Sequence, residues 1–134
     1  LVNFNIQYMI IFVKAKVYPT ENEKKVKKSI KNLLEIDLKM EGSYIIGKDT
    51  QKKSLEKIYL LLRSQGIITS ARKLFLKKVR GNNLNFELNK QAAYVGAVNL
   101  AGNSHLGAIH ITIKSEDIIS LIDWMAPDIK EGKN

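Results

Sequence analysis

The feature that most constrains the fold is a regular alternation of apolar and polar residues in several short segments. Residues 84–89 alternate leucine or phenylalanine with asparagine or glutamate, and residues 109–114 alternate isoleucine with histidine, threonine and lysine. Residues 9–17 begin as an apolar run and then alternate valine or alanine with lysine. Successive side chains of a strand point to opposite faces, so each segment predicts a strand with one buried face. Such strands are typical of an antiparallel sheet that has helices on one side.

A hairpin and one ambiguous segment complete the predicted sheet. Residues 36–41 alternate, and the turn at Gly42 leads to a short run over residues 44–47, which together predict a β-hairpin. Residues 89–100 are rich in small side chains and fit either a turn followed by a strand or one bent segment. We predict a strand from Tyr94 to Leu100.

Four segments carry apolar residues at helical spacing, and we expect a helix in each. They lie at about Glu21–Leu34, from Asp49 or Thr50 to Gly66, at about Thr69–Val79, and from Ser115 to Pro127. Thr20 and Glu23 form a T-x-x-E capping box at the first helix. Asp49 or Thr50 is the expected cap of the second helix, and Ser115 of the last one.

These elements predict a two-layer α+β fold in the order βαββααβββα, with a mostly antiparallel sheet and helices packed on one face. The length of 134 residues is that of one ordinary domain, so we expect a single domain over residues 1–134. Residues 128–134 are expected to form a flexible tail.

The charge of the chain is strongly positive and unevenly distributed. The formal net charge is +9, from 22 basic and 13 acidic residues. Residues 14–31 contain seven lysines and two glutamates, and residues 48–80 contain ten basic and two acidic residues. Such an excess favours polyanionic partners, because neutralising phosphates releases condensed counterions.

Basic residues on the polar sides of two predicted helices are the strongest candidates for a nucleic-acid site. They are Lys24, Lys28 and Lys31 on the first helix, and Lys73, Lys77 and Arg80 on or after the third, with Arg72 on its flank. An ordinary solvated helix face is the competing interpretation, and charge alone does not decide between the two. Lysine outnumbers arginine 19 to 3, which favours non-specific backbone contact over bidentate recognition of bases.

No pattern in the chain predicts catalysis, a metal or a cofactor. There is no cysteine, and neither His105 nor His110 has a nearby acidic residue at ligand spacing. The glycines lack the spacing of a phosphate-binding or dinucleotide-binding loop. The longest apolar run is far shorter than the roughly 18 residues of a membrane span. We therefore expect a non-catalytic, cytoplasmic protein that takes no small-molecule substrate.

Several segments together resemble an archaeal family of conserved uncharacterised proteins, whose members are often labelled RNA-binding or exosome-related. The resemblance covers roughly residues 13–127 and is carried by Tyr18-Pro19-Thr20-Glu21, Leu61-Leu62-Arg63-Ser64-Gln65, Ala71-Arg72-Lys73, Asn89-Lys90-Gln91-Ala92-Ala93-Tyr94-Val95-Gly96, Leu106-Gly107 and Ile122-Asp123-Trp124-Met125-Ala126-Pro127. It implies a fold similar to the ribosomal protein that binds 5S rRNA, and pairing into homodimers.

The sequence thus predicts an RNA-binding domain in which helix-borne lysines contact the phosphate backbone. Asn89, Lys90 and Gln91 are expected to add polar contacts to bases or sugar hydroxyls. The alternative is a structural or assembly protein that acts through homodimerisation or a protein partner. This alternative depends on three features: the polar face of the predicted sheet, Leu60, which falls toward the polar side of its helix, and the acidic last helix.

Overall fold

The computed structural model describes residues 8–100 and 107–129. Its elements, in chain order, are β1 (Met9–Lys16), α1 (Glu23–Leu33), β2 (Leu38–Glu41), β3 (Tyr44–Asp49), the 3-10 helix η1 (Lys52–Leu55), α2 (Glu56–Ser64), α3 (Ile68–Lys78), β4 (Val79–Arg80), β5 (Asn83–Asn89), α4 (Lys90–Tyr94), β6 (Ala108–Ser115) and α5 (Ile118–Met125).

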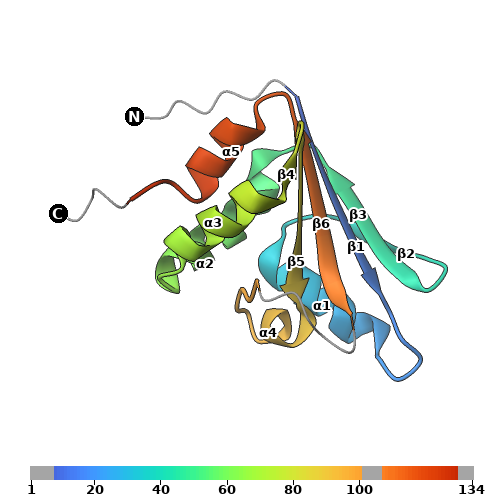
Figure 1. Cartoon of the computed structure of the whole chain (residues 1–134). Coiled ribbons are helices and arrows are strands. Elements are labelled where there is room, and N and C mark those ends of the chain that lie inside the picture. The colour runs from blue at the N-terminus through green and yellow to red at the C-terminus, as the bar shows by residue number, and fades with distance from the viewer. Residues whose placement is uncertain (1–7, 101–106, 130–134) are drawn as a thin grey trace.

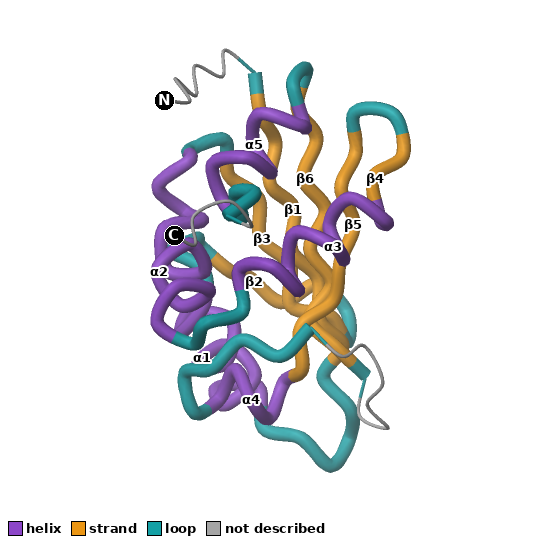
Figure 2. Tube along the Cα trace, turned by 60° about the vertical axis from the view of Figure 1, so that its left-hand side comes forward, coloured by secondary structure: helices purple, strands orange, loops and turns teal. Residues whose placement is uncertain are grey.

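The strands form one sheet in the order β2-β3-β1-β6-β5-β4, and every neighbouring pair is antiparallel. The helices cover one face of this sheet and leave the opposite face, which we call the open face, uncovered (Figure 1). Along the covered face α5 lies at one end, α3 and α2 in the middle, and α1 with α4 at the other end (Figure 2). This confirms the predicted α+β class. The likeness to the 5S rRNA-binding protein stays a prediction.

The alternation in the sequence is what separates the two faces. In β1, Ile11, Val13 and Ala15 are fully buried against the helices, while the residues between them point away from the core. On the helical side, Phe75 of α3 packs against Phe86 of β5 with ring centroids 4.8 Å apart. A tilted aromatic pair of this kind adds about 1 kcal/mol beyond the burial of its surface. It fixes α3 against the sheet, so the opposite side of α3 faces solvent.

Two elements differ from those predicted. The segment Tyr94–Leu100 is not a strand, because Asn89 caps the short helix α4 and Gly96 turns the chain at φ 82°. The segment beyond α4 is held instead by the side chain of Gln65, whose amide bonds both the N–H and the carbonyl of Val98. Val79 was expected to end α3, but it starts β4 and pairs with Leu84 across the turn at Gly81.

The helix starts are also shifted from their predicted caps. The side chain of Asn22, not Thr20, accepts the amides of Lys24 and Lys25 and begins α1. Asp117, not Ser115, caps α5 by accepting the N–H of Ser120. Serine, threonine, asparagine and aspartate can all cap a helix, so the sequence offers several candidates within a few residues.

Asp49 does not cap α2. It ends β3, and its carboxylate accepts hydrogen bonds from the Thr50 amide and the Ser54 hydroxyl. The chain then forms η1, and α2 begins only at Glu56. Gly66 follows α2 at φ 68°, which confirms the predicted stop.

The sequence predicted a flexible C-terminal tail and no membrane-spanning segment. Of the predicted tail, residues 130–134 lie outside the described residues. Within the described ranges, no helix has the length and apolarity that crossing a bilayer requires.

Candidate nucleic-acid interface

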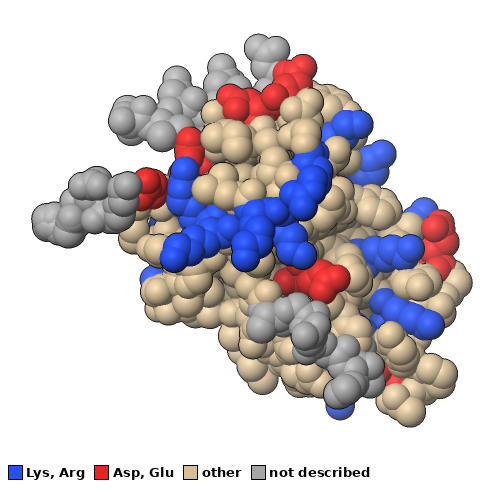
Figure 3. Space-filling view, viewed as in Figure 1, with Lys and Arg blue, Asp and Glu red and all other residues tan. Residues whose placement is uncertain are grey.

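Four exposed cations follow one another along α3 and into β4, and we call them the α3 ridge: Lys73, Lys77, Lys78 and Arg80. Ala71 and Phe75 are the fully buried residues of α3, which places Lys73 and Lys77 on the side away from the sheet. The chain turns from α3 straight into β4, and Arg80 folds back to donate to the carbonyls of Lys77 (2.9 Å) and Val79 (2.8 Å). The basic surface therefore runs unbroken from the helix onto the edge of the sheet (Figure 3).

The charges of the ridge reinforce one another. Among the described residues, no salt bridge involves any of its four members. Lys77 and Lys78 lie in the last turn of α3, where the helix dipole favours positive charge. Exposed like charges within the Debye length of about 8 Å repel one another, and a bound polyanion would relieve this repulsion. Lys78 was not predicted as a site residue, because it falls at an apolar phase of an ideal helix. It is exposed because α3 ends there.

Arg72 does not belong to this ridge. Its Nη1 donates to Asp123 Oδ1 (2.8 Å) and to the carbonyl of Ala126 (3.1 Å), and the side chain is mostly buried. Arg63 of α2 also binds the C-terminal end of α5, where its guanidinium donates hydrogen bonds to the carbonyls of Trp124 and Met125. The last carbonyls of a helix have no partner within the helix, so both arginines fasten the C-terminus of α5. Arg72 thus has a structural role at this helix end, and its contact with phosphate stays a prediction.

The lysines of α1 form a separate group. Lys24, Lys28 and Lys31 are exposed, as expected, but α1 lies beside α4 at the far end of the helical layer from α5 (Figure 2). The ammonium of Lys28 lies 4.9 Å from the ring centroid of Tyr94. The structure therefore does not join the lysines of α1 to the α3 ridge.

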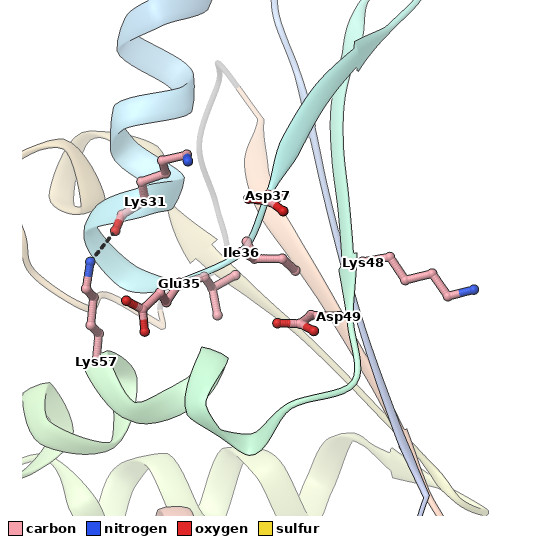
Figure 4. Close-up of a pocket in the computed structure, with 8 residues that line it drawn as sticks. Lys31, Glu35, Ile36, Asp37, Lys48, Asp49 and Lys57 are labelled. Atoms are coloured by element: carbon pink, nitrogen blue, oxygen red, sulfur yellow. Dashed lines mark hydrogen bonds between the residues drawn. The ribbon is translucent and has the colours of Figure 1, made fainter.

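Lys31 also borders a pocket of about 290 Å³ between α1, β3 and the start of α2 (Figure 4). Three carboxylates and three lysines line it together with Leu34 and Ile36: Glu35, Asp37, Asp49, Lys31, Lys48 and Lys57. Lys57 Nζ donates to the carbonyl of Lys31 at 2.8 Å. A lining with balanced charge has no preference for a phosphate, so we assign no anion site to this pocket.

The three residues expected to read bases have different surroundings. Asn89 is the N-cap of α4, and its side chain accepts the amide of Ala92. Lys90 is only 4% exposed, and its ammonium donates to Glu21 Oε1 (3.0 Å) and to the carbonyl of Lys16. Gln91 is exposed. Asn89 and Lys90 therefore hold α4 in place, and Gln91 alone of the three presents its side chain to solvent.

The described residues contain no group of three or more histidines or carboxylates that could hold a metal ion. His110 is paired with Glu87 at 3.2 Å on the exposed side of the sheet. His105 lies outside the described residues.

Comparison with known proteins places the chain in a recognisable group. A family model described as RNA binding matches residues 10–115, a span that includes the whole sheet except Met9 at the start of β1, and the whole α3 ridge. A UPF0201 protein of Thermococcus onnurineus (strain NA1) is 43% identical over 126 residues, covering 90% of this chain and 93% of the relative. The UPF0201 protein MJ1564 of Methanocaldococcus jannaschii is 42% identical over 134 residues, covering 92% of this chain and 76% of the relative.

Solved structures give the same result. A crystal structure of the UPF0201 protein from Methanococcus jannaschii matches with a TM-score of 0.79 at 38% identity, covering 92% of this chain and 96% of that one. A crystal structure of an uncharacterized UPF0201 protein matches with a TM-score of 0.80 at 29% identity, covering 89% and 94%. These matches confirm the archaeal family that the motif segments indicated.

Proposed function

We propose that this chain, which belongs to the UPF0201 family of archaeal proteins, is a non-catalytic RNA-binding domain whose α3 ridge contacts the phosphate backbone. The observation that carries the proposal is the ridge itself: Lys73 and Lys77 on the solvent side of α3, continued by Lys78 at the helix end and Arg80 in β4. All four are exposed, and no ion pair among the described residues neutralises them. The match to a family model described as RNA binding supports the choice of RNA as the polyanion.

The chemistry of the ridge favours contact with the backbone over readout of sequence. Three of its four cations are lysines, which act as point charges on flexible stems. Phosphate contacts fix position on a nucleic acid but carry no sequence information. We therefore expect binding that depends strongly on salt and weakly on base composition.

The lysines of α1 and Gln91 are proposed as weaker, secondary contacts. Lys24, Lys28 and Lys31 keep their exposure, but Lys28 is engaged with Tyr94 and Lys31 shares a pocket with carboxylates. Their net attraction for phosphate is smaller than that of the ridge, because neighbouring charges and rings already interact with them.

The test compares two triple variants that change the net charge equally. Lys73→Glu, Lys77→Glu and Arg80→Glu together remove the ridge, and Lys24→Glu, Lys28→Glu and Lys31→Glu alter α1. With an RNA duplex of about 16 base pairs at low salt, the ridge variant should lose affinity by roughly a hundredfold, at on the order of 1 kcal/mol per contact. The α1 variant should lose less than about tenfold.

Equal losses in the two variants would show that net charge, not the ridge, determines affinity. Undiminished binding by the ridge variant would overturn the proposal. Circular dichroism and thermal melting of both variants establish that each is folded.

A further inference from the structure

The open face of the sheet combines positive charge with an exposed aromatic ring. In β1 the residues that alternate with the buried ones point away from the helices, and Phe12 among them is 39% exposed. The strand register places Phe12 opposite Lys48 of β3 on one side and Thr112 of β6 on the other. Directly opposed residues of an antiparallel pair lie about 5 Å apart, so Lys48 is a near neighbour of the ring.

A hollow lies beside this ring. It has a volume of about 350 Å³, and Phe12 and Ile46 give it apolar walls while Lys39 and Lys48 contribute cations; Asp37, Leu38 and Gly47 complete the lining. Its size lies within the range of small-ligand sites. An apolar floor bordered by ammonium groups is the arrangement that accepts a flat, uncharged ring attached to a phosphate.

The charge of the whole open face is positive. Its outward positions carry five lysines, one arginine and two glutamates, for a net charge of +4 with His110 neutral: Lys14, Lys16, Lys39, Lys48, Lys114, Arg80, Glu41 and Glu87. The ammonium of Lys14 lies 4.3 Å from the centroid of the Tyr44 ring, so a second aromatic group adjoins the lysines. This combination has the two components of single-strand recognition, a cationic track and aromatic stacking platforms.

The same charges weigh against a second copy of the chain as the occupant. A twofold symmetric dimer through this face would bring two patches of the same sign together. Opposed like charges at an interface are unfavourable and reduce association. A single-stranded RNA instead supplies phosphates to the lysines and unpaired bases to Phe12, whereas a duplex keeps its bases stacked inside.

We infer that the open face binds single-stranded RNA, with an unpaired base stacked on Phe12 and the adjoining phosphates held by Lys39 and Lys48. The inference rests on the proposed function, since it assigns a second surface to an RNA-binding chain. Lys73 and Lys77 of the ridge lie on the helical layer, whereas Arg80, which pairs with Asn83, and Lys78, which borders a hollow with Glu87 and His110, lie where the ridge meets the open face. One RNA that has a duplex and a single-stranded segment could therefore engage both surfaces.

The experiment measures binding of an unstructured oligouridine strand and of an RNA duplex by the full chain. Phe12→Ala should weaken binding of the single strand about tenfold, which is ~1.4 kcal/mol and within the range for loss of one stacked base. Phe12→Tyr keeps an aromatic ring and should bind as the wild type does. Lys48→Glu changes an exposed residue and leaves the Phe12 ring intact, and it should also weaken binding of the single strand. Leu60→Ala is the matched control, because Leu60 is an apolar residue of α2 that is 61% exposed and lies outside the open face.

Selective loss of single-strand binding in Phe12→Ala and Lys48→Glu, with duplex binding within about twofold of wild type, supports the inference. Unchanged single-strand binding in both variants overturns it, while loss of duplex binding in the ridge variant would leave the proposed function standing. A wild-type chain that binds neither RNA overturns both. A wild-type dimer that Phe12→Ala or Lys48→Glu converts to monomer, without any change in RNA affinity, would show that a second copy covers the face.

Discussion

The α3 ridge and the open face of the sheet are both positive, but they are built differently. A helix repeats its side every three to four residues, so the ridge sets Lys73 and Lys77 in one row. Lys78 at the end of α3 and Arg80 in β4 extend this row. A sheet sets neighbours side by side across strands, so the open face places lysines next to Phe12 and Tyr44. The ridge therefore offers positive charge without an aromatic ring, which suits a phosphate backbone, whereas the open face offers charge with aromatic rings, which suits unpaired bases.

The largest expected effect comes from removing both surfaces at once. Combining Phe12→Ala with Lys73→Glu, Lys77→Glu and Arg80→Glu should lower affinity for a duplex with a single-stranded tail by roughly a thousandfold, because effects at distant sites add. Fluorescence anisotropy with the tailed duplex measures it against the two parent variants. A loss no greater than that of the ridge variant alone would mean that the two surfaces do not act independently.

The substitution Lys90→Met tests whether Lys90 stabilises the fold or contacts RNA. The ammonium of Lys90 is buried against Glu21, and removing one member of such a pair leaves an uncompensated charge, which costs about 3 kcal/mol of folding stability. Urea unfolding measures this loss, and RNA affinity should stay within about twofold of wild type. Adding Glu21→Gln should restore part of the stability. A large fall in RNA affinity without loss of folding stability would indicate that Lys90 contacts RNA directly.

Arg72→Met should have a smaller effect of the same kind. It removes charged hydrogen bonds to Asp123 and to the carbonyl of Ala126 in a partly exposed setting, which corresponds to about 1–2 kcal/mol. Thermal unfolding should show the loss, and duplex binding should be unchanged. If duplex affinity instead falls as far as it does on changing Lys73 to Met, Arg72 must be counted as part of the ridge.

The sequence predicts those structural features that depend on neighbouring residues, and it does not predict those that depend on contacts between residues far apart in the chain. The alternation over residues 84–89 and 109–114 is local, and it correctly indicates which side of each strand is buried. The exposure of Lys73 and Lys77 follows from the same reasoning applied to a helix. The roles of Arg72 and Lys90 depend on partners about 50 and 70 residues away, Asp123 and Glu21, so no local pattern contains them.

The start of α4 and the role of Phe12 leave a signal in the sequence, but each signal fits more than one interpretation. Asn89 followed by good helix formers marks the start of α4, but the small residues after it fit a strand equally well. An aromatic residue at the outer position of a strand is ordinary in itself. Phe12 becomes a candidate site residue only when the sheet order shows that β3 places Lys48 opposite it.

The smallest expected effect concerns α5, which carries neither surface. Hydrogen bonds from the Ser120 hydroxyl and then the Ser120 amide hold the pKa of Asp117 below its usual value. A lowered folded-state pKa means that this cap contributes stability above the unfolded-state pKa and loses it as pH falls through the folded-state value. Asp117→Asn should flatten a slight acid-side decline in thermal stability and leave RNA affinity unchanged. An identical decline in wild type and variant would contradict this assignment.

The salt dependence of duplex binding tests the central claim most directly. If all four ridge cations contact phosphates at about 0.9 released counterions each, the wild-type plot of log affinity against log salt should have a slope of about −3.6 between about 50 and 200 mM salt. The Lys73, Lys77 and Arg80 variant should bind far more weakly with a slope near −1 or shallower. The same slope in both proteins, or no duplex binding by the wild type at the lowest salt, would contradict the assignment of RNA binding to the α3 ridge.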